Sequence, residues 1–461
     1  MTLRHLIDDS GEAGIAIRPI RKQDWKSFLE AREPAVKRWL EATRFDADPG
    51  KSRLVPRPEG DIREVLLGLG PEPSPWDWAA LPAELPPGNY HLEGVAPADA
   101  EAAALGWALG TYRFNRRSAP KERELASLVW PKACRRERVE AAAEATFLVR
   151  DLINAPASEL GPAELAEAGE SLAKSRGADV RTLVGPALLE ERFPAIHAVG
   201  RAAAPERAPR LLDVRWGDPS HPKVSLVGKG VCFDSGGLDL KPANNMKLMK
   251  KDMGGAAHVL GLGSMIMTLG LPVRLRVLVP AVENSVSGSA MRPLDVVPTR
   301  KGTTIEIGNT DAEGRVILAD TLHEASTESP ALLVDFATLT GAARVALGAE
   351  LPALFSNDDA TAEALLAKSR TEADPLWRMP LFAPYRKLIE SKVADITNSP
   401  DAPLGGAITA ALFLQEFVDT NVPWAHIDLM AWSSSSRPGR PEGGEAMGLR
   451  AVFAHIEERF H

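Results

Sequence analysis

Cysteine is scarce in this chain, which has two, Cys134 and Cys232, among 461 residues. Two cysteines are too few for the disulfide framework that supports small secreted proteins. Neither lies in a Cys-x-x-Cys pair, so the usual sequence sign of a zinc or redox site is also missing. We therefore interpret both as structural thiols.

Long apolar runs are absent as well. No stretch reaches the roughly 18 to 20 apolar residues that a membrane-spanning helix needs. The first residues, MTLRHLIDDSGEAG, become acidic where a signal peptide would be basic and then apolar. We expect a cytoplasmic protein.

An excess of positive charge is missing too. The net charge of −8 gives no long-range attraction to nucleic acid or to an anionic membrane. Two common hydrolase motifs, Gly-x-Ser-x-Gly and His-Glu-x-x-His, are not found in the chain. The sequence therefore gives no motif that supports a serine hydrolase or a one-metal zinc protease.

The residues that are present have the composition of a globular protein, with 44% hydrophobic and 25% charged residues. The length is sufficient for two domains, and the character of the chain changes near residue 140. Before that point, proline-rich connections such as VPRPEGD alternate with amphipathic stretches, which predicts a smaller mixed α/β domain over residues 1–136. Helix formers follow from Glu137 to Asn154, and we expect a linking helix within residues 137–160.

Residues 161–461 alternate between short apolar runs and helical patterns. The expected strands are RLLDVRW, KVSLVGKG, VRLRVLVPAV, ALLVDFATL and WAHIDLM, and the expected helices lie at 255–269, 317–327 and 407–418. Such alternation predicts a larger C-terminal domain with a central, largely parallel sheet flanked by helices. The predicted fold class is therefore α/β with two domains.

Two polar, glycine-rich stretches follow expected strands in this second domain. The first is LVGKGVCFDSGGLDLKPANNMKLMKKDMGGAA, residues 226–257, and the second is GNTDAEGRV, residues 308–316, after the short strand TTIEI. Sites in such sheets form where strands end and loops begin. Each motif taken alone is equally typical of a plain turn.

Taken together, the two stretches supply four carboxylates, from Asp234, Asp252, Asp311 and Glu313. If the loops converge, these charges repel one another strongly unless cations compensate them. Two divalent ions would balance them, and oxygen ligands suit Mn²⁺ or Mg²⁺ while carboxylates also bind Zn²⁺. The pattern predicts a hydrolase in which paired metals activate a bridging water or hydroxide.

The motifs VGKGVCFDSGGLDLKP, MKKDMGGAA and NTDAEGR, in this order and separation, resemble those of the leucyl aminopeptidase (cytosol aminopeptidase) family of dinuclear-metal exopeptidases. The resemblance covers roughly the last two thirds of the chain. It implies a metal-dependent aminopeptidase that removes N-terminal residues from short peptides. It also implies a homohexamer, assembled as a dimer of trimers.

The resemblance assigns roles to individual residues of this chain. The metal ligands are Lys229, Asp234, Asp252, Asp311 and Glu313, with Asp234 and Glu313 bridging two divalent ions, Mn²⁺ or Zn²⁺. The catalytic cations are Lys241, which polarises the scissile carbonyl, and Arg315, which holds a bicarbonate that serves as general base. A lysine binds metal only as the neutral amine, and keeping Lys229 neutral at pH 7 costs about 4 to 5 kcal/mol. The affinity for the metal ion is therefore expected to fall as the pH falls.

The family pattern also indicates the residues that bind substrate, which are Met249, Asn309, Thr338, Leu339, Gly341 and Met430. Met430 departs from the pattern, because most relatives have alanine at this position when the sequences are aligned without a gap. A methionine there would narrow the pocket for the first side chain, which favours leucine and methionine over tryptophan and tyrosine. The alternative is a two-residue deletion that leaves Met430 in the core.

Two rival functions remain open at the level of sequence. One is a dipeptidase of the same fold, for instance one acting on Cys-Gly. The other is a DNA-binding or regulatory protein, because FNRRSAPKERE and KACRRERVE form a basic cluster over residues 113–138 that includes Arg116, Arg117, Arg135 and Arg136. Interleaved glutamates favour a solvated face for this cluster, and we expect no nucleic-acid partner. His258 and His426 are expected to be structural, since neither has a ligand-spaced partner.

Overall fold

The structure is a computed structural model that describes residues 3–9, 14–114, 124–401 and 404–461. It divides into two compact units, which we name the N-terminal unit (Met1–Phe147 and Ser435–Glu442) and the C-terminal unit (Leu148–Ser434 and Gly443–His461). The division falls inside helix α5 (Arg136–Asn154), close to the helix expected from Glu137 to Asn154. The domain limits of 1–136, 137–160 and 161–461 remain predictions.

The N-terminal unit contains a mixed sheet with the strand order β1-β6-β5-β2-β4-β3. Its strands are β1 (Leu6–Ile7), β2 (Ile15–Arg21), β3 (Ser52–Pro56), β4 (Ile62–Leu69), β5 (Asn89–Leu92) and β6 (Ser127–Val129). Its helices are α1 (Trp25–Glu30), α2 (Pro34–Ala42), α3 (Leu81–Glu84) and α4 (Pro97–Thr111). The apolar residues of β2, α2, β3 and β4 pack into one core that includes Ile20, Leu40 and Leu66.

The basic cluster of this unit is only partly described. Arg116 and Arg117 lie outside the described residues. Arg135 pairs with Glu101 at 2.7 Å, and Arg136 pairs with both Asp8 and Glu140, while both arginine side chains remain about half exposed. These neighbouring carboxylates support the expectation of a solvated face rather than a phosphate-binding surface.

The C-terminal unit is built on a larger sheet with the order β16-β15-β18-β14-β9-β11-β8-β7, in which β10 also pairs with β11. The strands are β7 (Asp179–Val184), β8 (Arg210–Trp216), β9 (Lys223–Gly228), β10 (Gly230–Asp234), β11 (Arg274–Asn284), β14 (Leu332–Ala337), β15 (Ala353–Ser356), β16 (Trp377–Arg378) and β18 (Trp424–Asp428). Small separate sheets join β12 (Val296–Pro298), β13 (Thr304–Glu306) and β17 (Ile396–Thr397), and β19 (Trp432–Ser433) with β20 (Gly443–Gly444). All five expected strand segments are strands here.

The middle of this sheet is parallel, and antiparallel pairs flank it. β9, β14 and β18 run side by side in one direction, with Leu226 opposite Val334 and Val334 opposite Ala425. β11 is parallel to β9 and β10, whereas the pairs β8–β11, β7–β8 and β15–β18 are antiparallel. The carboxyl ends of the central strands therefore lie at one edge, where the polar loops begin.

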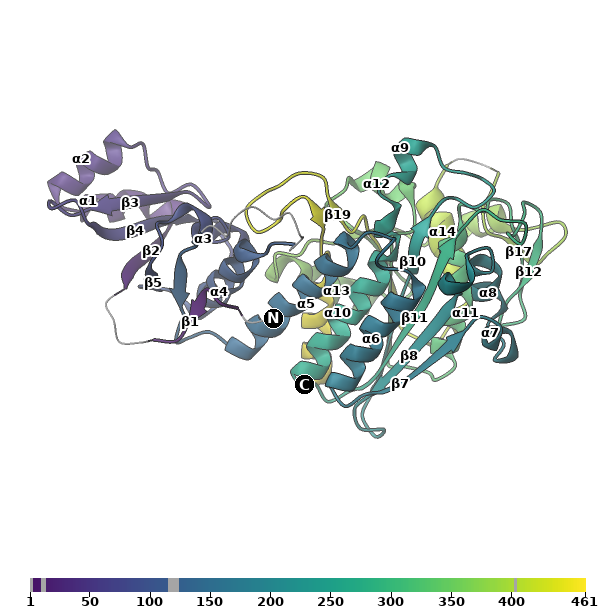
Figure 1. Cartoon of the computed structure of the whole chain (residues 1–461). Coiled ribbons are helices and arrows are strands. Elements are labelled where there is room, and N and C mark those ends of the chain that lie inside the picture. Colours follow the sequence, from purple (N-terminus) through teal and green to yellow (C-terminus); the bar gives the residue numbers. More distant parts are fainter. Residues whose placement is uncertain (1–2, 10–13, 115–123, 402–403) are drawn as a thin grey trace. The chain divides into compact units, whose positions relative to one another are not determined.

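Helices cover both faces of the sheet. Figure 1 shows α6 (Pro162–Ser175) and α10 (Gly254–Thr268) on one side of strands β8 and β11, and α8 (Pro194–Gly200) and α11 (Glu313–Ser326) on the other. The remaining helices are α7 (Ala187–Glu190), α9 (Ala243–Met246), α12 (Gly341–Leu347), α13 (Asp359–Thr371), α14 (Gly406–Gln415) and α15 (Leu449–Phe460). The predicted α/β class with a largely parallel central sheet flanked by helices is confirmed.

The expected helix at 317–327 begins four residues early, at Glu313. The first turn contains Gly314, and glycine is a poor helix former. Helix propensity alone therefore placed the start of the helix too late. This correction matters for function because it places Glu313 and Arg315 on the first turn of a helix rather than in a loop.

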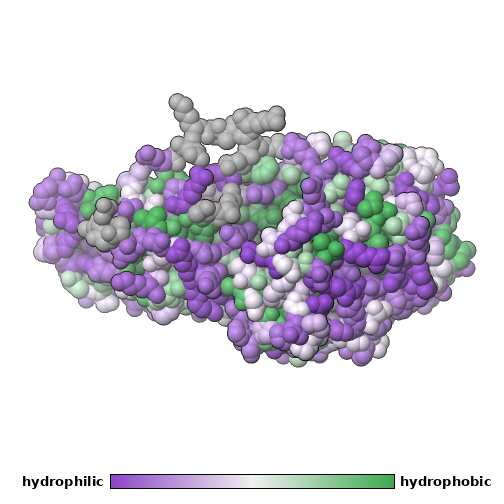
Figure 2. Space-filling view, turned by 60° about the horizontal axis from the view of Figure 1, so that its bottom comes forward, coloured by the Kyte–Doolittle hydropathy of each residue, from purple (hydrophilic) through white to green (hydrophobic). Residues whose placement is uncertain are grey.

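The large apolar side chains of both units are mostly inside. A continuous core of the C-terminal unit includes Val227, Leu278 and Leu318, all fully buried. Figure 2 shows one face of the molecule, on which hydrophilic residues predominate and apolar residues lie in scattered patches. Among the described residues, we find no helix with the length and apolar character that crossing a bilayer requires.

Candidate active site

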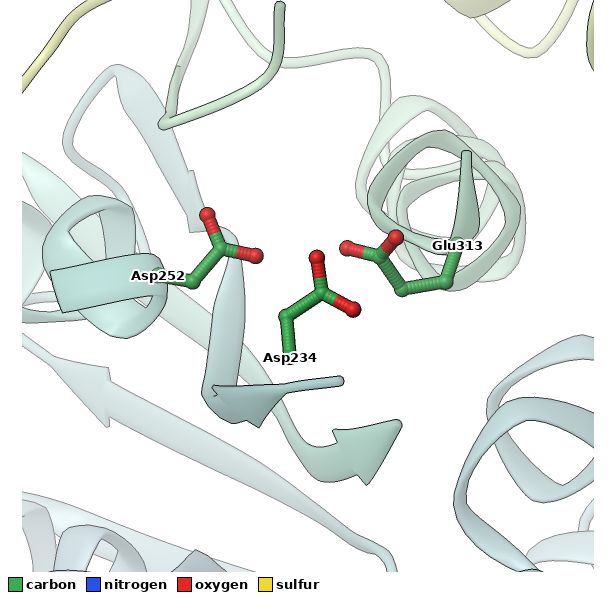
Figure 3. A group of neighbouring side chains, drawn as sticks. All are labelled: Asp234, Asp252 and Glu313. Atoms are coloured by element: carbon green, nitrogen blue, oxygen red, sulfur yellow. The ribbon is translucent and has the colours of Figure 1, made fainter. Parts of the chain in front are cut away.

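Three buried carboxylates converge at the edge of the sheet in the C-terminal unit. Asp234 is the last residue of β10, Asp252 lies in the short helix Met249–Met253, and Glu313 is the first residue of α11. Each offers an oxygen, and the three oxygens lie within 4.8 Å of one another. Figure 3 shows the three side chains turned toward a common point from a strand end and two helices.

The loop after β10 fixes the orientation of Asp234. The backbone N–H of Gly236 and the side-chain amide of Asn284, at the end of β11, each donate to Oδ1 of Asp234 at 2.9 Å. Gly236 and Gly237 have φ of +88° and +65°, a conformation that favours glycine. The Asp-Ser-Gly-Gly motif thus turns the chain so that Oδ2 of Asp234 faces Lys241, 2.8 Å away.

Lys229 enters the same cluster from the connection between β9 and β10. Its Nζ lies 2.7 Å from Asp252 Oδ2 and 2.9 Å from Glu313 Oε1, and it donates to the carbonyl of Thr338 at 3.0 Å. A Cβ on Gly314 would lie 2.4 Å from the lysine side chain, so glycine is required for this close approach. Although burial opposes it, the carboxylates raise the pKa of Lys229, so a metal ion must displace a firmly held proton to bind there.

Lys241 and Asp311 form the more open part of the cluster. Lys241 pairs with both Asp234 and Asp311, and its side chain is 12% exposed. Burial opposes a higher pKa for Lys241, but Asp234 and Glu313 raise it, so this cation stays protonated. Burial and the charge of Asp234 raise the pKa of Asp311 to about 6.

Glu313 is the least compensated carboxylate of the group. It is almost completely buried, and neither of its oxygens accepts a hydrogen bond from a described residue, although Oε1 lies near Lys229. Burial and the charge of Asp234 raise the pKa of Glu313 to about 8. Buried carboxylate oxygens without donors fit the coordination of divalent cations, which take oxygen ligands in this kind of site.

Arg315 lies on the first turn of α11, which follows the loop of residues 308–312. Its Nη1 donates to the carbonyl of Asn398 at 2.6 Å, and burial lowers the pKa of Arg315 to about 10, which leaves it cationic at neutral pH. The Asn398 side chain accepts from the N–H of Gly308 and of Asn309 and donates to two carbonyls of the same loop. Asn398 therefore holds both the loop and the guanidinium.

Asp428, at the end of β18, organises the opposite wall. Its carboxylate accepts hydrogen bonds from the N–H of Leu339 at 3.0 Å, and from the N–H and hydroxyl of Thr340 at 3.2 and 2.6 Å. The neighbouring Thr338 hydroxyl donates to Asp252 Oδ1 at 2.8 Å. The loop between β14 and α12 is thereby tied to a candidate metal ligand on one side and to β18 on the other.

These loops enclose a cavity of about 480 Å³. The sequence-predicted site residues that line it are Lys229, Asp234, Lys241, Met249, Asp252, Asn309, Asp311, Arg315, Thr338, Leu339, Gly341 and Met430. Glu313 does not line the cavity but lies in the carboxylate cluster beneath it. The structure therefore brings all thirteen predicted residues into one region, while their individual roles remain predictions.

Met430 lies at the cavity and not in the core. It follows β18 in a half-buried position, and its sulfur lies 3.5 Å from Nη1 of Arg344. The alternative of a deletion that turns Met430 into the core does not fit this position. Ala431, the next residue, has φ of +56° and is fully buried, so the chain turns inward only after Met430.

The sequence reasoning missed several residues that shape this cavity. Asn284, Asn398 and Asp428 hold the loops, and two cations, Lys251 and Arg344, line the walls. Burial lowers the pKa of Lys251 to about 8. Asn284 and Asp428 stand at strand ends, a signal that was available, but Asn398 and Arg344 belong to no motif.

The two buried histidines have structural partners. The ring of His258 bonds the carbonyl of Gly254 through Nδ1 at 2.6 Å and accepts from the N–H of Met447 at Nε2. His426 Nδ1 lies 2.6 Å from the buried carboxylate of Asp335. Neither lines the cavity, in keeping with the structural role expected for both.

Comparison with known families gives matches over both units. A family model described as "Cytosol aminopeptidase family, catalytic domain" matches residues 147–453. A second model, "M17 aminopeptidase, N-terminal domain", matches residues 15–131.

Individual proteins agree with these matches. The probable cytosol aminopeptidase of Syntrophotalea carbinolica is 42% identical over 370 residues, which is 77% of this chain and 74% of the relative. The probable cytosol aminopeptidase of Parasynechococcus marenigrum is 38% identical over 452 residues and 92% of each chain.

Solved structures are similar along the whole chain. The crystal structure of the cytosol aminopeptidase from Coxiella burnetii has a TM-score of 0.93 at 49% identity, covering 99% of this chain and 100% of that one. The bottromycin maturation enzyme BotP in complex with Mn has a TM-score of 0.87 at 37% identity, with 98% and 100% covered.

Proposed function

The chain belongs to the cytosol aminopeptidase family and is a metal-dependent aminopeptidase, and we propose that it releases the first residue of short peptides at the cavity of the C-terminal unit. The observation that carries this proposal is the convergence of three buried carboxylates within 4.8 Å, in which the one cation beside Glu313 is Lys229, 2.9 Å from Oε1, among the described residues. Such a cluster is costly without cations.

Two divalent ions would be held by the five residues of the family pattern, Lys229, Asp234, Asp252, Asp311 and Glu313, with Asp234 and Glu313 shared between them. When bound, the ions would polarise the peptide carbonyl and activate the water molecule that attacks it. We propose Mn²⁺ or Zn²⁺, and the complex of the similar enzyme BotP with Mn supports the first.

We assign Lys241 to the oxygen of the scissile carbonyl. Its ammonium lines the cavity and stays charged, because Asp234 and Glu313 raise its pKa despite burial. A charged donor held in a partly closed cavity stabilises the negative charge that develops on this oxygen as the tetrahedral intermediate forms.

Arg315 is the second cation, and we assign it to a bicarbonate ion that accepts the proton of the attacking water. Its hydrogen bond to the Asn398 carbonyl fixes the direction of the guanidinium at the cavity. No histidine is among the described residues that line the cavity, so a docked anion supplies a base that the side chains do not.

The substrate's first side chain would lie against Met249, Thr338, Gly341 and Met430, with Asn309 and Leu339 beside the backbone. Support comes from the cavity, which all six of these residues line. The loop that carries Thr338 and Leu339 is held rigidly by Asp428, which is what a substrate-binding wall needs.

The assembly we propose is a homohexamer, a dimer of trimers, on the basis of the family resemblance. The C-terminal unit exposes large apolar side chains, among them Leu294, Val345, Val393 and Leu404, between 66% and 86% exposed. Exposed apolar side chains of this size are typical of surfaces that other subunits cover. Native mass spectrometry gives the subunit number directly.

The central experiment is metal reconstitution. The chain is stripped with a chelator, dialysed, and reloaded with Mn²⁺, Zn²⁺ or Mg²⁺ singly, and hydrolysis of leucine 4-methylcoumaryl amide is measured. We expect no activity in the stripped protein, recovery with one or more ions, and none on N-acetyl-leucine amide, which lacks the free amine. Comparing a dipeptide with a tripeptide separates an aminopeptidase from a dipeptidase, and equal hydrolysis of the acetylated amide would contradict the proposal.

A further inference from the structure

Arg344 borders the part of the cavity that would receive the first side chain of the substrate. It lies on α12 and is exposed toward the cavity, which it lines. Its Nη1 lies 3.5 Å from the sulfur of Met430, and a Cβ built on Gly341 would lie 3.7 Å from its Nη2. Both neighbours are residues of the proposed first-side-chain pocket.

Arg344 has no anionic partner among the described residues, in contrast to Lys229 and Lys241, which are paired with the carboxylate cluster. Lys229 contacts Asp252 and Glu313, Lys241 contacts Asp234 and Asp311, and Arg315 donates to a carbonyl. Within the described part of the chain, the Arg344 guanidinium bonds the thioether of Met430, which is a weak acceptor. A guanidinium carries five N–H donors in a planar fork that matches a carboxylate.

We propose that Arg344 recognises a carboxylate on the first side chain of the substrate, so that glutamyl peptides are accepted and lysyl and arginyl peptides are disfavoured. This inference rests on the proposed aminopeptidase function. Glutamate suits the pocket because its methylene groups would lie along Met430 and Met249 while its carboxylate reaches the guanidinium. Lys251, which also lines the cavity, adds a second positive charge that a cationic side chain would have to face.

The free carboxylate at the far end of a dipeptide is the other anion that could meet Arg344. The contacts favour the side chain, because Arg344 touches Met430 and Gly341, which belong to the first-side-chain pocket. Amide substrates that lack a terminal carboxylate separate these two sources of the same charge.

The test compares glutamate with glutamine, which has almost the same shape and no charge. Values of kcat/KM are measured for the 4-methylcoumaryl amides of Glu, Gln, Lys and Leu with the metal-loaded wild type, Arg344→Gln and Arg344→Glu. We expect the Glu:Gln ratio to fall about fivefold in Arg344→Gln, mainly through KM, as for a half-exposed ion pair. In Arg344→Glu the ratio should fall further and the Lys:Gln ratio should rise.

Arg370→Gln is the matched control. Arg370 is exposed on α13, does not line the cavity, and its substitution changes the net charge equally. Its Glu:Gln ratio should equal that of the wild type. In the wild type alone, raising the ionic strength from about 0.05 to about 0.5 M should lower the Glu:Gln ratio, because salt screens an exposed pair.

Three outcomes would overturn the inference. An unchanged Glu:Gln ratio in both Arg344 variants would remove Arg344 from side-chain recognition. If leucyl dipeptides, measured in parallel, lost activity in the Arg344 variants while the Glu:Gln ratio of the amides stayed unchanged, Arg344 would be assigned to the terminal carboxylate instead. A wild type that hydrolyses none of the four amides after metal loading would overturn the proposed function and this inference with it.

Discussion

Two groups of charged side chains in the C-terminal unit differ in how many cationic partners their carboxylates have. In the arginine cluster, formed by Arg215, Arg276, Arg300, Asp213, Glu324 and Glu328, every carboxylate is hydrogen-bonded to a guanidinium, at distances such as 2.7 Å from Arg276 to Glu324. In the candidate active site, two lysines serve four carboxylates, because Lys229 contacts Asp252 and Glu313 while Lys241 contacts Asp234 and Asp311. Neither oxygen of Glu313 accepts a well-directed hydrogen bond from a described residue.

This difference distinguishes a structural charge cluster from a cluster that is expected to bind metal ions. Asp234, Asp252 and Glu313 are buried, whereas in the arginine cluster only Arg276 is buried and the other members are partly exposed. Burying charges is compensated only when partners are well placed. The arginine cluster has permanent partners, which the fold supplies. The active-site cluster has fewer, which is the condition expected where ligands from outside complete the coordination. Glu313 and Glu324 show the contrast within one helix, because both lie on α11.

The largest effect is expected for Glu313→Gln. Removing the charge of this proposed metal ligand should lower kcat/KM for leucine amides by at least about 10³. The free energy of unfolding without metal should change little near neutral pH, since burial raises the pKa of Glu313 to about 8 and glutamine resembles the protonated carboxyl in shape. Activity, metal content and chemical denaturation measure the three quantities.

Glu324→Gln is the matched variant on the same helix. It should keep the activity per folded molecule and lose stability, because it removes a partner of Arg276 and Arg300. Lys241→Ala should instead keep metal content while kcat falls. If Glu313→Gln were active with two metals bound, or if the two glutamate variants behaved alike, the contrast between the clusters would be wrong.

The second effect is on stability. Arg276→Gln should lower the free energy of unfolding by about 2 to 3 kcal/mol, because it removes the buried guanidinium that three partly exposed carboxylates share. The molecules that remain folded should hydrolyse leucine amides within about twofold of the wild-type rate, since additivity holds for distant sites. Urea denaturation with an activity assay below the transition tests both statements, and an equal loss of activity at full folding would contradict them.

The candidate active site could largely be predicted from the sequence, because its residues lie in two short motifs with fixed spacing. Asp234, Asp252 and Glu313 were predicted from chemistry and resemblance, and the strands that end near them were predicted from apolar runs. The helix start at Glu313 was missed because Gly314 weakens the helical pattern where Lys229 needs room.

Residues that act through tertiary contacts could not be predicted in this way. Asn398 lies 89 positions from Asn309, which it holds, and Arg344 lies 86 positions from Met430. The arginine cluster gathers side chains from β8, β11, α11, the turn after α11 and the loop before β13, and none of them forms a local pattern. Only the fold decides which of these charges acquire partners.

The third effect is a change of stability with pH, and it is expected at His258. Like the arginine cluster, this residue has permanent hydrogen-bond partners in the fold. Both ring nitrogens of His258 are hydrogen-bonded in the neutral form, and burial lowers its pKa to about 4. The unfolded chain takes up a proton near pH 6.5 and the folded chain does not. The stability from His258 is therefore complete above pH 6.5 and is lost as the pH falls toward 4.

Comparison with His258→Gln isolates this contribution from other titrating groups. Between pH 7.5 and 5.0 the wild type should lose about 2 kcal/mol more stability than the variant, from the linkage of its two pKa values. Denaturation curves at several pH values in the stripped protein give the difference. Parallel losses in the two proteins would mean that His258 is protonated in the folded state.

The smallest effect concerns Met430, which lines the cavity and can be compared with a methionine of the core. Met430 is half buried at the cavity, so Met430→Ala should change stability by no more than about 0.5 kcal/mol. Its removal should widen the proposed first-side-chain pocket. We expect the ratio of kcat/KM for tryptophan over leucine amides to rise about fivefold, near the lower end of what a methylene contributes to discrimination. Met291→Ala is the control, because Met291 is 3% exposed in the core and should lose about 2 to 5 kcal/mol of stability at an unchanged ratio. If Met430→Ala instead behaved like the core variant, with lower stability and the wild-type ratio, the side chain would not form the pocket wall, and the preference for leucine and methionine would need another cause.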